Sequence, residues 1–320
     1  MNEALAACLG EFTEPNALYL PIHYLFEAGG KRVRPVLTLL ACEAVGGDPR
    51  KAMSAAVAVE LLHNFTLMHD DIMDRSPKRR GRETVHVRYD ENTAILSGDV
   101  MIGMAMRMLE RSADLAPQPM DVIKAFTTGL IEVCEGQALD MTLPERNDVT
   151  PEEYFTMINK KTAKLLEMSV SIGALIGGAN AAQIDHLTTF AREIGIAFQM
   201  QDDLLDIYGS EQFGKAAGGD IVEGKRTWLL LQTRDRANAG GDATSPCAAV
   251  IHDFYASNGL PRERVNEMMS CMQQLGVLDD AEAEIRKITE DAFTHLHALP
   301  SSAARDTLEE LAEKLVARTH

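Results

Sequence analysis

Two short acidic motifs in the sequence both read Asp-Asp-x-x-Asp. The first covers residues 70–74 and the second covers residues 202–206. Each ends a long apolar stretch with a helical pattern, so the first and last Asp of each motif are expected on one helix face. Like charges at a helix C-terminus destabilise the helix by about 0.3–1 kcal/mol. A hard divalent cation such as Mg²⁺ offsets this repulsion, because it binds carboxylate oxygens and completes its shell with water and phosphate.

Basic side chains gather near both acidic motifs, although the chain carries a formal net charge of −17. Runs of Lys and Arg occupy residues 29–35, 78–82 and 160–161, and two further lysines follow the second motif. Arg binds phosphate in bidentate fashion and Lys supplies a point charge. The motifs and cations together predict a site for Mg²⁺ and a phosphorylated substrate. The alternative is a set of solvated charged faces, and the repetition of both patterns argues against it.

His63 lies seven residues before Asp70 and therefore falls near the helical stripe of the first motif. This position favours a role in the site, with a satisfied core histidine as the alternative. The acidic net charge argues against nucleic acid and anionic membrane surfaces as partners.

Helices are the elements expected to position these residues, because the composition favours Ala, Leu, Met and Glu and contains few aromatic residues. Residues 210–224 are predicted to form a glycine-rich loop, and residues 233–246 are the most linker-like segment. One large helical bundle spanning residues 1–320 as a single domain explains the pattern most simply. The helical patterns cover residues 53–74, 92–111, 120–141 and 182–208. Residues 150–153 have the capping pattern of a helix start.

Location in the cytoplasm is expected from three features. The first residues lack the basic region of a signal peptide. Residues 165–182 are apolar but rich in Ser, Gly and Ala and contain Glu167, so they predict a closely packed buried helix and no stable membrane insertion. The five cysteines are scattered, which favours reduced thiols.

The motifs and their order resemble the trans-polyprenyl diphosphate synthases, the family of farnesyl and geranylgeranyl diphosphate (FPP and GGPP) synthases. A single Asp-rich motif would be weak evidence for this family, but the ordered set of motifs between Gly29 and Trp228 is specific to it. The resemblance implies an all-α bundle of the isoprenoid (terpenoid) synthase type with a central active-site cavity. The shared segments are GGKRVRP (29–35), HNFTLMHDDIMD (63–74), KRRG (78–81), GQALD (136–140), KKTA (160–163), FQMQDDLLD (198–206) and FGKAAGGDIVEGKRT (213–227).

Roles for individual residues follow from the resemblance. The direct Mg²⁺ ligands would be Asp70, Asp74 and Asp202. The other three carboxylates would bind Mg²⁺ through water or hold the direct ligands in place: Asp71, Asp203 and Asp206. The diphosphate of isopentenyl diphosphate would be bound by Lys31, Arg34, His63 and Arg80. The allylic diphosphate would be bound by Arg79, Lys161, Lys215 and Lys225. The developing positive charge would be stabilised near Lys161, Thr162 and Gln199. About three Mg²⁺ ions would bind with the diphosphate.

The implied reaction is prenyl transfer, in which an allylic diphosphate ionises and isopentenyl diphosphate attacks the resulting cation. Phe65 and Thr66 lie just before the first motif, where the family sets the floor of the product pocket. The bulk of Phe65 favours a C20 product, geranylgeranyl diphosphate, with the C15 farnesyl product as the alternative. The resemblance also implies a homodimer.

Two other interpretations remain at this point. A terpene cyclase would share the fold and the first motif, but it would usually carry a different second metal motif. A non-catalytic helical partner subunit of a prenyl synthase would be expected to lose one Asp motif, whereas this chain keeps both.

Overall fold

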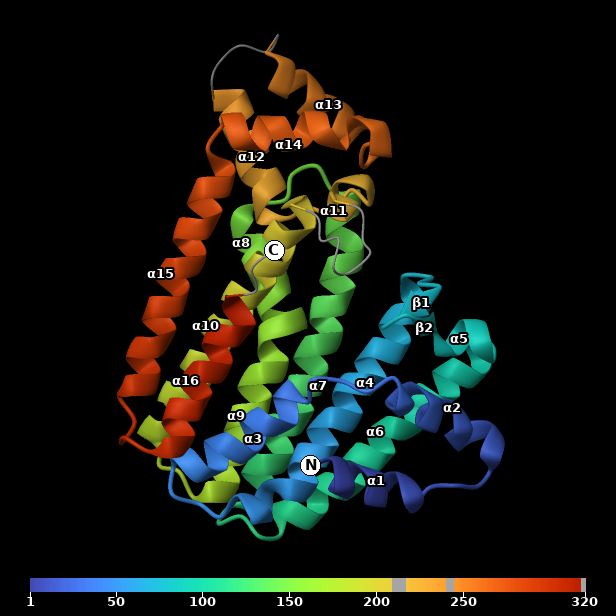
Figure 1. Cartoon of the computed structure of the whole chain (residues 1–320), viewed down its shortest axis with the longest axis vertical. Helices are drawn as coiled ribbons and strands as arrows, with labels where there is room; N and C mark the ends of the chain where they lie inside the picture. Colours follow the sequence, from blue (N-terminus) through green and yellow to red (C-terminus); the bar gives the residue numbers. More distant parts are fainter. Residues whose placement is uncertain (209–216, 240–244, 318–320) are drawn as a thin grey trace. The chain divides into compact units, whose positions relative to one another are not determined.

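A computed structural model describes residues 1–208, 217–239 and 245–317 of the chain. The described residues are mostly helical and contain almost no strands, which confirms the all-α prediction (Figure 1). The helices up to the second Asp motif are α1 Asn2–Gly10, α2 Asn16–Glu27, α3 Val33–Ala44, α4 Met53–Met73, α5 Val85–Arg88, α6 Glu91–Ala113, α7 Pro119–Thr142, α8 Pro151–Ile158, α9 Lys164–Gly177 and α10 Ala181–Tyr208. The later helices are α11 Gly219–Val222, α12 Trp228–Ala239, α13 Pro246–Ser257, α14 Val265–Gln274, α15 Val277–His297 and α16 Ala303–Val316.

Short elements connect several of these helices. The strands β1 Lys78–Arg79 and β2 Arg82–Glu83 form an antiparallel hairpin. Among the described residues, the 3₁₀ turns η1 Pro49–Ala52, η2 Leu143–Glu145 and η5 Arg262–Arg264 precede or follow helices. A single π-helical turn, η3 Asn159–Ala163, joins α8 to α9.

Two of the irregular segments predicted from the sequence were wrong in part. The linker-like segment 233–246 is helical up to Ala239, because it begins within α12. The loop predicted at 210–224 contains the short helix α11. Residues 210–216 of that loop and residues 240–244 lie outside the described residues.

The contacts divide the chain into two compact units. Unit 1 comprises residues 1–130, 165–188 and 298–308, and unit 2 comprises residues 131–164, 189–297 and 309–320. The boundaries at residues 130, 164, 188 and 308 fall inside helices α7, α9, α10 and α16. Each unit therefore takes its residues from several separate stretches of the chain, and each presents one of the two Asp motifs.

The core of unit 1 is built around α4, whose residues from Ala55 to Leu62 are all buried. Helix α9 packs closely on α3 because it carries glycines at the contact. A methyl group placed on Gly173 would lie 2.0 Å from the carbonyl oxygen of Thr38. The buried helix predicted at 165–182 is therefore confirmed as far as Gly177, where α9 ends, and α10 begins at Ala181. In the described part of the chain, no helix is both long and apolar enough to cross a bilayer.

The core of unit 2 contains buried side chains from α8, α10, α12, α13, α14 and α15. Within it, Cys247 of α13 and Cys271 of α14 form a disulfide with their Cα atoms 5.5 Å apart. The prediction of five reduced thiols was therefore wrong for this pair. The remaining three, Cys8, Cys42 and Cys134, form no disulfide in the described part of the chain.

Candidate active site

The first Asp motif in unit 1 lies where α4 ends. The N–H group of Asp74 donates to the carbonyl oxygen of Asp70 at 2.8 Å, which closes the last turn. Arg75 then adopts a left-handed conformation at φ 50° and turns the chain away. Asp71 is buried, whereas Asp70 is partly exposed and Asp74 is exposed. The motif thus holds its second carboxylate inside the unit and leaves the other two accessible.

Asp71 is held by the first arginine of the following hairpin. The Nε atom of Arg79 donates to both carboxylate oxygens of Asp71 at 2.9 Å. Burial raises the pKa of Asp71, and the charge of Arg79 opposes that rise. The hairpin reverses at Arg80 and Gly81, which have φ values of 51° and 77°. Two successive positive φ values match a type I′ turn, in which glycine is favoured and arginine is strained.

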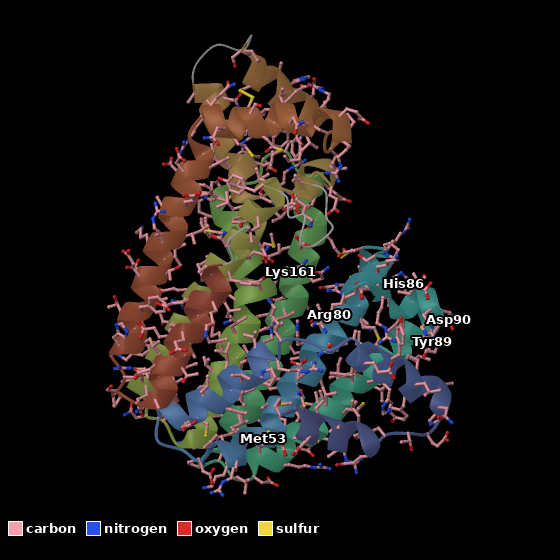
Figure 2. All side chains as sticks on the ribbon, viewed as in Figure 1. Met53, Arg80, His86, Tyr89, Asp90 and Lys161 are labelled. Atoms are coloured by element: carbon pink, nitrogen blue, oxygen red, sulfur yellow. A yellow bond between two sulfur atoms is a disulfide. The ribbon has the colours of Figure 1, made fainter. Side chains whose placement is uncertain are left out.

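Arg80 reaches from this turn to the segment before α3, where its guanidinium donates to the carbonyl oxygen of Gly29. Figure 2 marks Arg80 within unit 1. A left-handed residue at a tight turn costs about 1–2 kcal/mol when it is not glycine. Such strain is typical of functional sites, so the conformation of Arg80 agrees with a role in binding an anion.

Arg34 and His63 form a partly buried pair in the same unit. The Nη1 atom of Arg34 donates to Nε2 of His63 at 3.1 Å, so that ring nitrogen carries no proton. Burial lowers the pKa of Arg34 to about 10. Burial, Arg34 and Arg80 hold the pKa of His63 well below its usual range. Lys31 lies near this pair in sequence and is exposed.

Arg32 and Glu60 were missed by the sequence reasoning. Arg32 adopts a left-handed conformation at φ 53° immediately before α3, and its guanidinium is paired with Glu60. Asn64 donates to the same carboxylate of Glu60 at 3.0 Å. A signal for Glu60 was present, since it is the single charge within the apolar run that precedes His63.

The second Asp motif, in unit 2, lies on the last turns of α10 and also buries its second member. The hydroxyl of Tyr154 donates to Oδ2 of Asp203 at 2.6 Å, and Nε2 of Gln199 donates to Oδ1 at 2.9 Å. The hydroxyl of Thr162 donates to Oε1 of Gln199 at 2.8 Å. A continuous chain of hydrogen bonds thus joins three residues predicted to act in the site: Thr162, Gln199 and Asp203. Tyr154, which completes it, was not predicted.

The neighbours of Asp203 make its environment strongly acidic. Burial and the charge of Asp220 raise the pKa of Asp203 to about 8, despite opposing effects from Tyr154 and Gln199. The backbone N–H of Asp220 donates to Oδ2 of Asp206 at 3.0 Å. Asp220 also lies 3.1 Å from Nζ of Lys225. These contacts bring together Asp203, Asp206 and Lys225, as the sequence predicted, whereas Lys215 lies outside the described residues.

Lys161 and Thr162 lie on the π-helical turn η3, and Figure 2 marks Lys161 there. Two glycines allow neighbouring helices to touch this turn. A methyl group on Gly136 would lie 2.2 Å from the backbone nitrogen of Lys161, and one on Gly195 would lie 2.5 Å from the Cα of Ala163. The ammonium of Lys161 is paired with Asp140. Single π-turns occur frequently at functional sites, because they shift the side chains that follow.

The two residues predicted to control product length lie on α4 one turn before the first Asp motif. Phe65 is 7% exposed, and its ring meets the ring of His69 edge-on at 4.7 Å. His69 in turn packs on Gly98 of α6. Thr66 is partly buried and its hydroxyl donates to the carbonyl oxygen of His63 at 2.8 Å. Phe65 is therefore packed within unit 1.

A model of the polyprenyl synthetase family matches residues 15–270 of the sequence. This chain belongs to that family. It is accordingly a prenyltransferase. The match spans both Asp motifs and the basic segments around them, so the family pattern covers the residues described above.

Several family members are similar over nearly their whole length. The geranylgeranyl pyrophosphate synthase of Geoglobus acetivorans is 36% identical over 320 residues, which cover 100% of this chain and 96% of the relative. A structure of the geranylgeranyl pyrophosphate synthetase from Pyrococcus horikoshii matches with a TM-score of 0.87 at 36% identity, covering 99% of this chain and 94% of that one. A decaprenyl diphosphate synthase from Rhodobacter capsulatus matches with a TM-score of 0.88 at 30% identity, covering 99% and 96%. The fold alone therefore does not determine the length of the product.

The polyprenyl synthetase family implies a requirement for a divalent metal. Among the described residues, no three or more His, Cys, Asp or Glu side chains form a group that could hold a metal ion by themselves. Mg²⁺ commonly takes only one or two carboxylates and completes its shell with water and substrate phosphates. Asp70 and Asp74 offer that type of donor, because the second Asp of the motif is occupied by Arg79. The chemistry of these residues therefore fits Mg²⁺ that binds together with a diphosphate.

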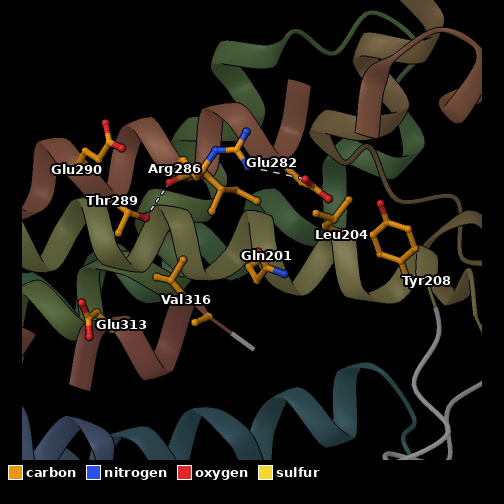
Figure 3. A pocket seen from close by; sticks show the side chains of 11 residues that line it. Gln201, Leu204, Tyr208, Glu282, Arg286, Thr289, Glu290, Glu313 and Val316 are labelled. Carbon is orange, nitrogen blue, oxygen red and sulfur yellow. Dashed lines mark hydrogen bonds and ion pairs between the residues drawn. The ribbon is translucent and has the colours of Figure 1, made fainter. Parts of the chain in front are cut away.

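A separate cavity of about 770 Å³ lies in unit 2 between α10, α15 and α16 (Figure 3). Gln201, Leu204 and Tyr208 line it from α10, on a different helix face from Asp202 and Asp206. Its other lining side chains include three glutamates, at 282, 290 and 313, and one arginine, at 286. The excess of negative charge makes this cavity unsuitable for a diphosphate.

Proposed function

We propose that this prenyltransferase condenses isopentenyl diphosphate with allylic diphosphates and releases geranylgeranyl diphosphate. The observation that carries the proposal is the same arrangement at both Asp motifs. In each, the second Asp is buried and tied to a neighbouring side chain, Arg79 for Asp71 and Tyr154 for Asp203. The first and last carboxylates of each motif are at least partly exposed, so metal and substrate can reach them.

The basic residues divide into two sets in this proposal. Lys31, Arg34, His63 and Arg80 bind the diphosphate of isopentenyl diphosphate. Arg79, Lys161, Lys215 and Lys225 bind the allylic diphosphate. The Mg²⁺ ions held at Asp70, Asp74 and Asp202 neutralise the departing diphosphate when bound. Asp71, Asp203 and Asp206 hold these ligands in place or bind through water.

Neutral polar groups complete the proposed site. The Thr162 hydroxyl and the Gln199 amide are linked at 2.8 Å, and they stabilise positive charge near the reacting carbons. Their hydrogen bonds to each other and to Asp203 hold them in one orientation, so little reorganisation is needed during the reaction. The double bond of isopentenyl diphosphate attacks the allylic cation, and the released diphosphate takes the proton that is then lost.

A C20 product is favoured over the C15 alternative by the relatives named geranylgeranyl diphosphate synthases, which are 36% identical over most of the chain. Phe65 supports a limited length of the product chain, because its buried ring packs against the ring of His69. Thr66, next to Phe65, lies at the same level of α4. We therefore assign the floor of the product pocket to Phe65 and Thr66.

The assembly proposed is a homodimer of single-domain chains that acts in the cytoplasm. Large apolar side chains on unit 1 support a partner surface: Leu96 of α6 is 59% exposed and Met120 of α7 is 63% exposed. Exposed apolar side chains that form a contiguous patch often mark contact surfaces. A charge introduced at Leu96 should shift the elution of the protein towards the monomer in size-exclusion chromatography with light scattering.

The proposed function is tested by removing one metal ligand from each motif. Asp70→Asn and Asp202→Asn should each lower kcat by about a hundredfold or more, since the departing charge loses its metal. The thermal unfolding midpoint should change little or rise, because each change also removes charge repulsion on a helix. Near-full turnover of either variant would contradict the metal assignment for that residue.

A further inference from the structure

Arg226 follows Lys225 directly in the chain and is buried in unit 2, where it is 3% exposed. Its guanidinium donates to the carbonyl oxygen of Gly224 at 2.6 Å, to the carbonyl oxygen of Arg146 at 2.9 Å and to Oδ1 of Asn258 at 3.0 Å. These acceptors are neutral groups, and a buried charge is strongly destabilising unless its donors are satisfied. The surrounding oxygens are therefore arranged to hold one guanidinium.

Two aromatic rings of α13 complete the surroundings of this side chain. The guanidinium carbon of Arg226 lies 5.1 Å from the ring centre of Phe254 and 4.6 Å from that of Tyr255. The face of an aromatic ring attracts a cation most strongly where water is excluded. A planar guanidinium stacks on rings and donates several hydrogen bonds in a fixed fork, which an ammonium group cannot do. Arg226 is thus held in one orientation against α13.

The hydrogen bond to Gly224 closes a tight turn around Lys225. Gly224 has a φ of 72°, in the region that favours glycine. A methyl group placed on Gly224 would lie 2.4 Å from the carbonyl oxygen of Asn258, so the turn packs directly on the residue that ends α13. The residues immediately before and after Lys225 are therefore both anchored at α13.

Lys225 connects this turn to the second Asp motif. Its ammonium lies 3.1 Å from Oδ1 of Asp220, and the backbone N–H of Asp220 donates to Oδ2 of Asp206 at 3.0 Å. The backbone N–H of Lys225 also donates to the carbonyl oxygen of Asp220 at 3.0 Å. The turn that Arg226 anchors is therefore joined through Asp220 to a carboxylate of the motif.

We propose that Arg226 is a positioning residue that fixes Lys225 for binding the allylic diphosphate, which rests on the proposed prenyl transfer. Lysine binds phosphate through a point charge on a flexible four-carbon chain, so a mobile backbone at Lys225 would add to the entropy lost on binding. Anchoring the residues on both sides of Lys225 reduces that loss before the substrate arrives. The guanidinium of Arg226 acts through Lys225, because its own donors are already used within unit 2.

The competing explanation is that Arg226 only stabilises unit 2 by tying the turn to α13. Loss of a purely structural residue lowers the amount of folded enzyme, and it changes the KM values of the two substrates alike or not at all. A residue that acts through Lys225 changes the KM of one substrate. Once Lys225 is itself removed, loss of Arg226 weakens the binding of that substrate no further.

The experiment compares the full-length wild-type protein with Arg226→Gln, Lys225→Ala and the double variant. Steady-state assays with Mg²⁺ give the KM for geranyl diphosphate and the KM for isopentenyl diphosphate. For Arg226→Gln we expect the KM for geranyl diphosphate to rise about tenfold and the KM for isopentenyl diphosphate to stay within about twofold. The double variant should match the KM of Lys225→Ala for geranyl diphosphate within about twofold.

Arg234→Gln is the matched control. Arg234 also donates to a backbone carbonyl, that of Val149 at 2.8 Å, and lies over the ring of Tyr255 at 6.0 Å, but it belongs to α12 and not to the turn around Lys225. This variant should have a lower thermal unfolding midpoint and KM values within about twofold of the wild type.

A second variant tests the same contact if Arg226→Gln does not fold. Asn258→Gly removes one acceptor of Arg226 and tolerates the left-handed conformation that Asn258 adopts at φ 53°. It should raise the KM for geranyl diphosphate at least about threefold and leave the KM for isopentenyl diphosphate within about twofold.

Three results would overturn the role of Arg226 while leaving the proposed function intact. The first is a wild-type KM for geranyl diphosphate in Arg226→Gln or, where that protein does not fold, in Asn258→Gly. The second is an equal rise in both KM values. The third is a double variant in which the two single effects multiply, because Arg226 would then act independently of Lys225. If the wild-type protein itself forms no condensation product, the proposed function fails, and the role of Arg226 fails with it.

Discussion

The partly buried position of His63, beside two arginines, predicts a specific dependence of stability on pH. Burial, Arg34 and Arg80 hold its pKa well below the ordinary value of 6.5. The unfolded chain therefore binds a proton on this residue at mildly acidic pH, whereas the folded protein does not. Because the unfolded state binds more protons, the free energy of unfolding falls as the pH drops through 6.5.

The size of the effect follows from that difference in proton binding. A histidine that titrates near 6.5 only when unfolded lowers the free energy of unfolding by about 1.4 kcal/mol at pH 5.5 and by about 0.1 kcal/mol at pH 7.5. His63→Gln removes the titrating ring and keeps an oxygen that accepts from Arg34. The loss of stability between pH 7.5 and pH 5.5 should therefore be smaller in this variant by about 1.3 kcal/mol.

Urea unfolding monitored by circular dichroism at both pH values measures this difference. His252→Gln is the control, because His252 is exposed, with 80% of its side chain accessible. The control should lose as much stability on acidification as the wild type. If His63→Gln also loses as much as the wild type, the folded protein protonates His63, and the neutral Arg34–His63 pair is refuted.

Three further predictions concern other contacts of the site. Tyr154→Phe removes the hydroxyl that donates to the buried carboxyl of Asp203 at 2.6 Å. The free energy of unfolding, measured by urea titration, should fall by about 1–3 kcal/mol. Unchanged stability would refute that hydrogen bond. Gly136→Ala forces α7 away from the π-turn and should lower both kcat and the thermal unfolding midpoint, whereas a wild-type midpoint would mean the contact is looser than described. Phe65→Ala should lengthen the products seen by chromatography at a cost of about 3–5 kcal/mol in stability, and an unchanged product spectrum would refute its role as the floor.

The long helices could be predicted because their signals are local. The apolar run before Asp70 and the Thr150–Glu153 capping box each specify an element within a few residues. Both Asp motifs consequently appear on the last turns of helices, as expected. Helix α12 was missed because its C-terminal half is polar and leads into a glycine-rich segment that resembles a linker.

The contacts that could not be predicted all depend on tertiary structure. Cys247 and Cys271 lie on different helices, and their sequence spacing matches no metal-binding or catalytic motif. Only the packing of α13 on α14 shows that the two side chains meet. Tyr154 lies far from Asp203 in sequence and reads as an ordinary core residue. The π-turn lies in close contact with Gly136, and no sequence periodicity can show such a contact.

The most direct test of the central claim is a product assay. Purified protein, Mg²⁺ and labelled isopentenyl diphosphate are combined in turn with dimethylallyl, geranyl and farnesyl diphosphate, and the chain lengths are determined by chromatography. We expect linear products that stop at C20 with each of these starters. Cyclic hydrocarbons, or no condensation with any starter, would contradict the account and favour a terpene cyclase or a non-catalytic partner subunit.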